Sequence, residues 1–239
     1  MYVDPVNYLP VVLSMAIGIA PVLYFRRNGM LFLLAALAYF MAIVAKAIVQ
    51  AVFYSFFHEQ QLATYIAYGA LTAVFEIGFA YAFALFYRGK FSAHRGWAYG
   101  SYLAFFENAI VVGAFGLLSL IVINLFVTQA TGLDSLASGN ILMSIPSAFE
   151  RITSLVAHAV WGYLALFAAV SRKPAYVLAG VPLAFIDSAA AWWDMTHAIS
   201  YPLLIAILFT FVVVWSAAAL AVTGQLGDAR RGLGRKAEA

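Results

Sequence analysis

The chain has 239 residues, of which 65% are hydrophobic and 10% charged, and its mean hydropathy of +0.94 is that of a protein whose natural solvent is lipid. This composition excludes an ordinary soluble domain. Cysteine is absent, which excludes disulfide frameworks, thiolate zinc sites and a cysteine nucleophile. The formal net charge of +3 is less informative than the positions of the charges along the chain.

Seven apolar stretches follow one another, each long enough to cross a hydrocarbon core of ~30 Å, which takes about 20 helical residues. They are residues 6–25, 30–56, 63–87, 97–127, 141–170, 174–192 and 201–223. The second, fourth and fifth are longer than needed, so these helices are expected to tilt, bend or project beyond the bilayer. We therefore predict an all-α, polytopic membrane protein whose residues 1–224 form a bundle of seven transmembrane helices.

Lysine and arginine are concentrated in every second connection and in the C-terminal tail. The basic segments are residues 25–29, 88–95, 171–173 and 228–239, whereas the alternate connections, 58–61, 128–140 and 194–200, contain no lysine or arginine. Because basic loops stay on the cytoplasmic side, this pattern predicts an N-terminus outside and a C-terminus in the cytoplasm. The protein is then a multi-pass protein of the cell membrane, with a basic cytoplasmic tail at 225–239 that is expected to be disordered and to contact anionic lipid.

The N-terminal segment has an acid, Asp4, where a secretory signal would have a base. The first span is therefore predicted to be a retained helix and not a cleaved signal.

Ionisable residues also occur inside the predicted spans. They are Lys46, Glu76, Glu107, Glu150, Arg151, His158 and Asp187. One ionised side chain at a helix centre costs roughly 2.5–3.5 kcal/mol on the insertion scale, so these groups must face one another or a wet cavity. Lys46 and Glu76, on neighbouring spans, are expected to pair. Glu150, Ser154 and His158 recur every four residues, so with Arg151 they form one polar stripe on the fifth helix.

Several kinds of chemistry are excluded by the residues available. No Ser/His/Asp set or Gly-rich serine motif is apparent, and the last span lacks the lysine that a retinal Schiff base needs. Zinc prefers several His or Cys ligands, and only one histidine lies deep in a span, so we predict no metal and no other cofactor. Carboxylate chemistry remains, since a glutamate in a low-dielectric cavity is well suited to take a proton from water.

Three segments carry a family resemblance. Residues 149–158, FERITSLVAH, hold a Glu-Arg pair followed by a histidine; residues 100–113, GSYLAFFENAIVVG, hold Glu107 between two glycines; and residues 75–79, FEIGF, hold Glu76. They resemble motifs of the glutamic-type intramembrane proteases, the group that contains the CAAX-processing and bacteriocin-processing (CPBP) enzymes, PrsW and, most similar to this chain, the YhfC-like proteins. The resemblance extends over about residues 65 to 195.

This resemblance implies a hydrolase that cuts membrane-embedded or membrane-adjacent peptide bonds by means of glutamate-activated water. Glu107 or Glu76 would be the general base and His158 would assist the oxyanion, with Glu150 and Arg151 positioning them. The chain differs from the family pattern at four positions, where the family has a glutamate, an arginine and two histidines: Phe75, Phe79, Leu103 and Leu183.

Two further polar residues are candidates for contact with the substrate. Asp187 keeps the acidic position of the family motif whose histidine is replaced by Leu183. Asn108 follows Glu107 directly but faces about 100° away from it on a helix, so a hydrogen bond that fixes helix packing is an alternative role. Asp194 and His197, in WWDMTH, fit an interfacial loop better than a site.

Two other functions would use the same residues. A non-catalytic binder or carrier could hold a lipid, an ion or a proton in the polar cavity, although the sequence offers no inverted repeat and no paired broken helices. A purely structural bundle would use the ion pairs for packing, and replacing Glu150 and Arg151 together would then be nearly neutral while either change alone would destabilise it. The expected partners are membrane lipid and a membrane-bound peptide or protein substrate, with no nucleic acid, and the oligomeric state is not indicated.

Overall fold

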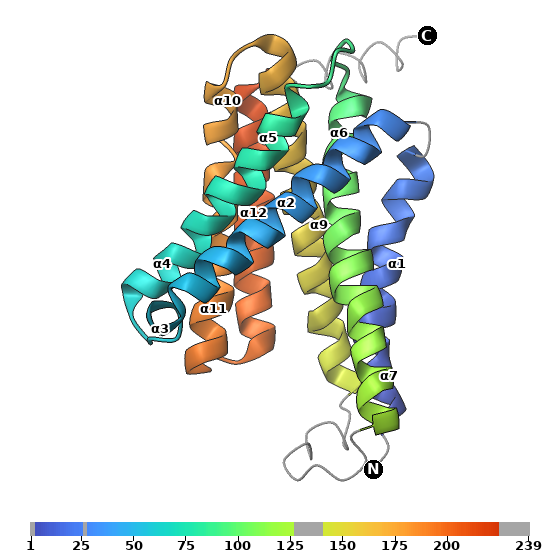
Figure 1. The fold of residues 1–239 in the computed structure, drawn as a ribbon, viewed down its shortest axis with the longest axis vertical. Coiled ribbons are helices and arrows are strands. Elements are labelled where there is room, and N and C mark those ends of the chain that lie inside the picture. Colours follow the sequence, from blue (N-terminus) through green and yellow to red (C-terminus); the bar gives the residue numbers. More distant parts are fainter. Residues whose placement is uncertain (1–2, 26–27, 127–140, 225–239) are drawn as a thin grey trace, which may run out of the picture.

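The computed structural model describes residues 3–25, 28–126 and 141–224, and every element in these ranges is helical (Figure 1). Seven helices in this part are long and apolar enough to cross a membrane, which confirms the predicted multi-pass helical membrane protein. The predicted connection at 128–140 and the basic tail at 225–239 lie outside the described residues, as do Arg26 and Arg27.

The first four spans are built as follows. Span one is η1 (Pro5–Asn7) with α1 (Tyr8–Phe25); span two is α2 (Gly29–Val52), followed by the short α3 (Tyr54–Phe57); span three is α4 (Leu62–Leu71), η2 (Thr72–Ile77) and α5 (Gly78–Ala84); span four is α6 (Ala93–Phe105), η3 (Phe106–Phe115) and α7 (Gly116–Phe126). The predicted second span, 30–56, is therefore too long, because the chain turns after Val52.

The last three spans complete the bundle. Span five is η4 (Ile141–Met143) with α9 (Ser144–Ser171); span six is α10 (Ala175–Leu178), η5 (Val181–Phe185) and α11 (Ile186–Thr196); span seven is α12 (Tyr201–Val222). Because α11 continues to Thr196, Asp194 lies at a helix end and not in the predicted loop.

Helix α9 is the central helix of the bundle. It is by far the most buried span, and it packs against α1, α5, α6, α10 and α12. Its closest approach is to α6, where Gly100 and Gly162 face each other and a Cβ on Gly100 would overlap the backbone of Ala159. Small residues allow helix backbones to come this close in a membrane, so this crossing fixes the position of the polar stripe on α9.

The close crossing gives a stability prediction. Gly100→Ala is expected to lower the free energy of unfolding by ~1–3 kcal/mol, because the two backbones would have to separate to admit one methyl group. Unfolding in mixed micelles, followed by circular dichroism, would measure the loss. Gly29→Ala is the matched control, since a Cβ there meets no atom within 4 Å and the change should be nearly neutral. Equal stability of the two variants would contradict the packing argument.

Two spans contain π-helical segments where the sequence predicts continuous α-helix. Segment η2 carries Glu76, and the ten-residue η3 carries Glu107 and Asn108. A π-helix holds an extra residue per turn, which re-aims the side chains around it, and such segments occur frequently at functional sites. In the buried core, η3 is supported from α1, because the Ser14 hydroxyl donates a hydrogen bond of 2.6 Å to the carbonyl of Asn108.

The sixth span is broken in its middle. After α10 the chain passes through the 3₁₀ segment η5, which has Pro182 in its first turn, and α11 starts at Ile186. Irregular backbone at membrane depth is tolerated where protein covers it or where it borders a cavity. Leu183 and Ala184 of η5 are fully buried, and Asp187 follows in the first turn of α11.

Candidate functional site

His158 of α9 is the centre of the candidate site. Its side chain is 2% exposed, and its Nδ1 lies 2.9 Å from the carbonyl oxygen of Ser154. A carbonyl oxygen only accepts hydrogen bonds, so Nδ1 carries a hydrogen and donates it. The other ring nitrogen, Nε2, is therefore directed away from the helix backbone and towards two glutamates.

Glu107, in the π-helical segment η3, is the nearer of these glutamates. Its Oε2 lies 2.9 Å from His158 Nε2, while its Oε1 accepts a hydrogen bond of 2.9 Å from the Ser154 hydroxyl and lies 3.4 Å from Arg151 Nη1. One carboxylate oxygen is thus held by α9 and the other faces the histidine. The Glu107 side chain is 22% exposed, so it is less enclosed by protein than those of His158 and Glu76.

Glu76, in the π-helical segment η2, approaches His158 from the opposite side. Its Oε2 lies 3.3 Å from His158 Nε2, and its Oε1 lies 2.5 Å from Lys46 Nζ. The same ammonium group donates to Asp187 Oδ2 at 3.0 Å and to Thr72 Oγ1 at 2.8 Å, and Thr72 donates to Asp187. The predicted pair of Lys46 with Glu76 is confirmed, and all three ammonium hydrogens have partners.

Arg151 connects the other end of the site to α12. Besides its contact with Glu107, its guanidinium donates to Glu150 Oε1, and the hydroxyl of Tyr201 donates to Glu150 Oε2. The side chain of Arg151 is 13% exposed and that of Glu150 is 37% exposed. Glu150 therefore lines open space, and Arg151 connects it to Glu107, which contacts the histidine.

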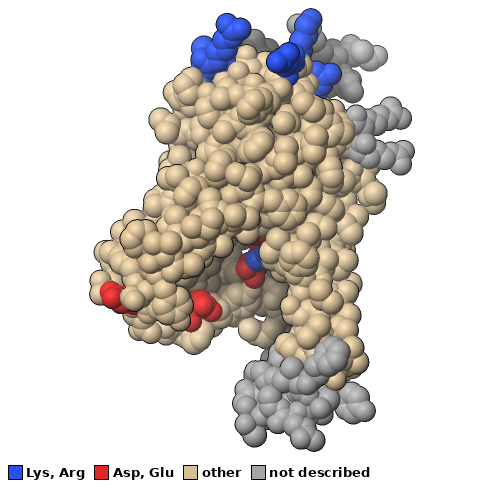
Figure 2. Space-filling view, viewed as in Figure 1, with Lys and Arg blue, Asp and Glu red and all other residues tan. Residues whose placement is uncertain are grey.

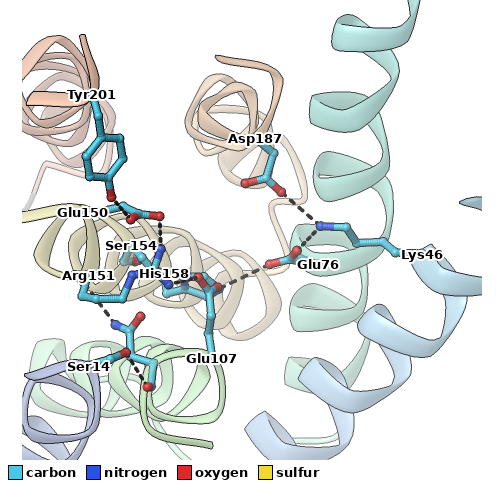
Figure 3. Close-up of polar contacts among 11 residues, drawn as sticks. Ser14, Lys46, Glu76, Glu107, Glu150, Arg151, Ser154, His158, Asp187 and Tyr201 are labelled. Carbon is cyan, nitrogen blue, oxygen red and sulfur yellow. Dashed lines mark hydrogen bonds and ion pairs between the residues drawn. The ribbon is translucent and has the colours of Figure 1, made fainter. Parts of the chain in front are cut away.

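All seven ionisable residues that the sequence places inside the spans join one network (Figure 3). It runs from Asp187 through Lys46 and Glu76 to His158, and then through Glu107 and Arg151 to Glu150. It involves four helical spans besides α9, namely those of α2, η2, η3 and α11, and Tyr201 adds α12. The expectation that these groups face one another in the bundle interior is confirmed.

A cavity of about 700 Å³ adjoins this network. Lys46, Glu150 and Asp187 line it together with aromatic and apolar side chains that include Trp193 and Tyr201. His158, Glu76 and Glu107 lie behind this lining. Figure 2 shows a hollow in the lower half of the view with acidic and basic atoms inside it, whereas lysine and arginine gather at the opposite, upper end of the molecule.

Asn108 is fully buried and does not line the cavity. Its amide nitrogen donates to the backbone carbonyl of Arg151 at 3.0 Å, while its Oδ1 has no partner among the described residues. These contacts tie η3 to α9, as the helix-packing interpretation expects. Asp187, the other candidate for substrate contact, does line the cavity.

The positions at which the chain differs from the family pattern are apolar. Leu103 and Leu183 are buried in the core, and the rings of Phe75 and Phe79 stack with centroids 6.2 Å apart. The residues that sequence reasoning missed are Thr72 and Tyr201, and Lys46 was expected only as a partner of Glu76. The hydroxyl groups of Thr72 and Tyr201 lie on apolar spans and follow no local sequence pattern. They can therefore be identified only from the assembled bundle.

Three ligand atoms of Glu76, Glu107 and His158 lie within 4.8 Å of one another, a set that could hold a metal ion.

Searches of protein-family models, of curated proteins and of solved structures find no match to this chain.

Proposed function

We propose that this protein is an integral-membrane hydrolase of the glutamic peptidase type, which cuts peptide bonds within or next to the membrane. The observation that carries the proposal is the convergence of Glu107 and Glu76 on His158 at the centre of the bundle, next to a cavity that Lys46, Glu150 and Asp187 help to line. Intramembrane ionisable residues mark functional sites by default, and here they are gathered at one place.

The geometry suggests a role for each group. Glu107 is the better base, since its side chain is 22% exposed against 7% for Glu76 and can therefore reach water more readily. It takes a proton from the water that attacks the peptide carbonyl. His158 stabilises the oxyanion when its Nε2 carries a hydrogen. Ser154 and Arg151 hold the second oxygen of Glu107, and Lys46 holds that of Glu76, so both carboxylates are positioned.

The experiment is hydrolysis of lipid-associated peptides by the purified chain in nanodiscs, with products identified by mass spectrometry. Glu107→Gln and His158→Ala are each expected to reduce the rate by ~10²-fold or more, the usual contribution of general acid–base groups. Glu59→Gln, at an exposed site away from the cluster, should keep the wild-type rate. Activity that survives Glu107→Gln together with His158→Ala would refute the assignment.

The same network favours one alternative, a carrier of protons or ions. Its chain of close charged groups reaches the cavity at both ends, through Asp187 and through Glu150. Liposome-reconstituted protein would then show a pH-dependent flux that Glu107→Gln abolishes, without any cleavage of peptides. Absence of both flux and ligand binding would remove this alternative.

The cavity bears on the orientation that we propose from the basic loops. Its lining includes Met143, Trp193 and Tyr201, which lie at the ends of their helices remote from the basic segments. With the N-terminus outside and the C-terminus in the cytoplasm, the cavity opens towards the outer half of the membrane. A substrate would then enter from the outside. The cysteine introduced by Met143→Cys should therefore react with a membrane-impermeant maleimide added to intact cells. Labelling only after the cells are permeabilised would contradict this orientation.

A further inference from the structure

The ligand atoms around His158 have the spacing of a metal site. Two ligand atoms that each lie about 2.1 Å from one ion, at angles between a right angle and a tetrahedral angle, are about 3.0–3.4 Å apart. His158 Nε2 is 2.9 Å from Glu107 Oε2 and 3.3 Å from Glu76 Oε2. Both edges are close to that range. All three atoms lie within 4.8 Å of one another, so they are close enough to share one ion, which would have further positions for water.

The hydrogen on Nδ1 of His158 also supports a metal ion at Nε2. Nδ1 donates to the carbonyl of Ser154, which in the neutral ring leaves Nε2 with a lone pair. Nε2 is fully buried and makes no well-aligned hydrogen bond in the described part of the chain. A lone pair directed at two carboxylate oxygens is repelled by both, whereas a cation between them attracts all three. Ligating histidines commonly donate their second N–H to a backbone carbonyl in this way.

The charge balance of the network also favours a bound cation when His158 is neutral. Among the described residues of the network, Lys46 and Arg151 are the two permanent cations, and they face four carboxylates, those of Glu76, Glu107, Glu150 and Asp187. With all four carboxylates ionised and His158 neutral, two negative charges remain uncompensated at a depth where unpaired charge is costly. One divalent ion, with His158 neutral, would balance them fully.

We infer that Glu76, Glu107 and His158 bind one divalent transition-metal ion such as Zn²⁺, for which a set of imidazole and carboxylate ligands is suited. The sequence-based expectation was that no metal is bound, because only one histidine lies deep in the spans. The two glutamates, re-aimed by π-helical segments, raise the number of ligands to three. Ions would approach through the cavity, whose lining residues Lys46 and Glu150 contact Glu76 and Arg151 of the network.

This site does not depend on peptide hydrolysis, since a carrier could use it equally. If both proposals hold, the ion would activate the water in place of Glu107, and His158 Nε2 would bind the ion and not the oxyanion. The reaction would remain peptide hydrolysis, but by a metal-dependent and not a purely glutamic mechanism. The two proposals can fail separately. A chain that binds metal but cuts no peptide removes only the hydrolase, and a chain that cuts peptides after metal removal and binds none removes only the metal site.

The test is direct binding of Zn²⁺ to the full chain. Tag-free protein in nanodiscs is treated with EDTA, dialysed and titrated with Zn²⁺ by calorimetry, and metal content is measured by mass spectrometry. We expect one ion per chain, with affinity reduced at least tenfold in Glu76→Gln, Glu107→Gln and His158→Gln, because loss of a ligand should exceed the tenfold effect of losing an outer-shell partner. Glu59→Gln and His58→Gln, both exposed, are matched controls that should bind as the wild type does.

A second measurement requires no change at the ligands. The ring of Trp161 lies with its centroid 4.2 Å from that of His158, so Co²⁺ in the site should quench its fluorescence. Trp161→Phe should lose this quenching and still bind Co²⁺. No binding by the wild-type chain, binding that survives all three ligand substitutions, or Co²⁺ binding without quenching of Trp161 would each overturn the inference, and the first result would leave His158 as an imidazolium paired with both glutamates.

Discussion

Replacement of Lys46 by methionine is expected to lower the free energy of unfolding by about 3–5 kcal/mol, the usual result of removing one partner from a buried ionic cluster. The Lys46 side chain is 14% exposed, and its ammonium group donates to Glu76, Asp187 and Thr72. Methionine fills a similar volume but leaves two carboxylates without their cation. Denaturation by SDS in mixed micelles, followed by circular dichroism and carried out with EDTA present, would measure the change.

Two further variants make this experiment decisive. The triple change Lys46→Met, Glu76→Gln and Asp187→Asn removes the cation together with both charges that need it, so it should recover much of the lost stability. Lys173→Met, at an exposed position in a basic connection, should alter stability by no more than about 0.5 kcal/mol. If the single Lys46→Met variant is as stable as the wild type, then removing Lys46 leaves no uncompensated charge on Glu76 and Asp187.

The seven spans could be predicted from the sequence because crossing a membrane depends on local composition. A run such as residues 201–223 is apolar over its whole length, and α12 occupies Tyr201–Val222. Charges in such runs are costly, so the seven interior ionisable residues had to converge, and they do. Lys46 and Glu76 could also be paired in advance, since they lie at similar depths on spans joined by a short connection.

The detailed site could not be predicted, because it depends on how the helices pack. Helical periodicity assumes a regular α-helix, while Glu76 and Glu107 both lie in π-helical segments that turn them towards His158. The hydroxyl of Tyr201 meets Glu150 only because α12 packs against α9.

The break in the sixth span did have a local signal. Gly180 and Pro182 lie in the middle of the predicted helix, where glycine and proline weaken or end helical structure. The structure confirms the predicted span over residues 174–192 as one of the seven, but the high hydropathy of this stretch does not distinguish an unbroken helix from two short pieces joined by a 3₁₀ turn.

Arg151→Met is also expected to lower the free energy of unfolding by about 3–5 kcal/mol. The contacts of Arg151 indicate that a second substitution at Glu150 will not restore most of this loss. The guanidinium contacts Glu107 at 3.4 Å as well as Glu150, so Arg151 serves two carboxylates from different helices. Under the purely structural alternative considered from the sequence, Glu150 and Arg151 could be replaced together with little effect. The double variant Glu150→Leu, Arg151→Met instead leaves Glu107 short of its cation and Tyr201 without its acceptor, so most of the loss should remain.

The contribution of Glu107 can be isolated by adding Glu107→Gln to that double variant. Because the glutamine is neutral, the triple variant should be more stable than the double, as expected if the Arg151–Glu107 contact is electrostatic. Arg88→Met, at an exposed position, controls for the general loss of an arginine. If the double variant unfolds like the wild type, Arg151 pairs with Glu150 alone, and Glu107 is held by Ser154 and His158 without help from the guanidinium.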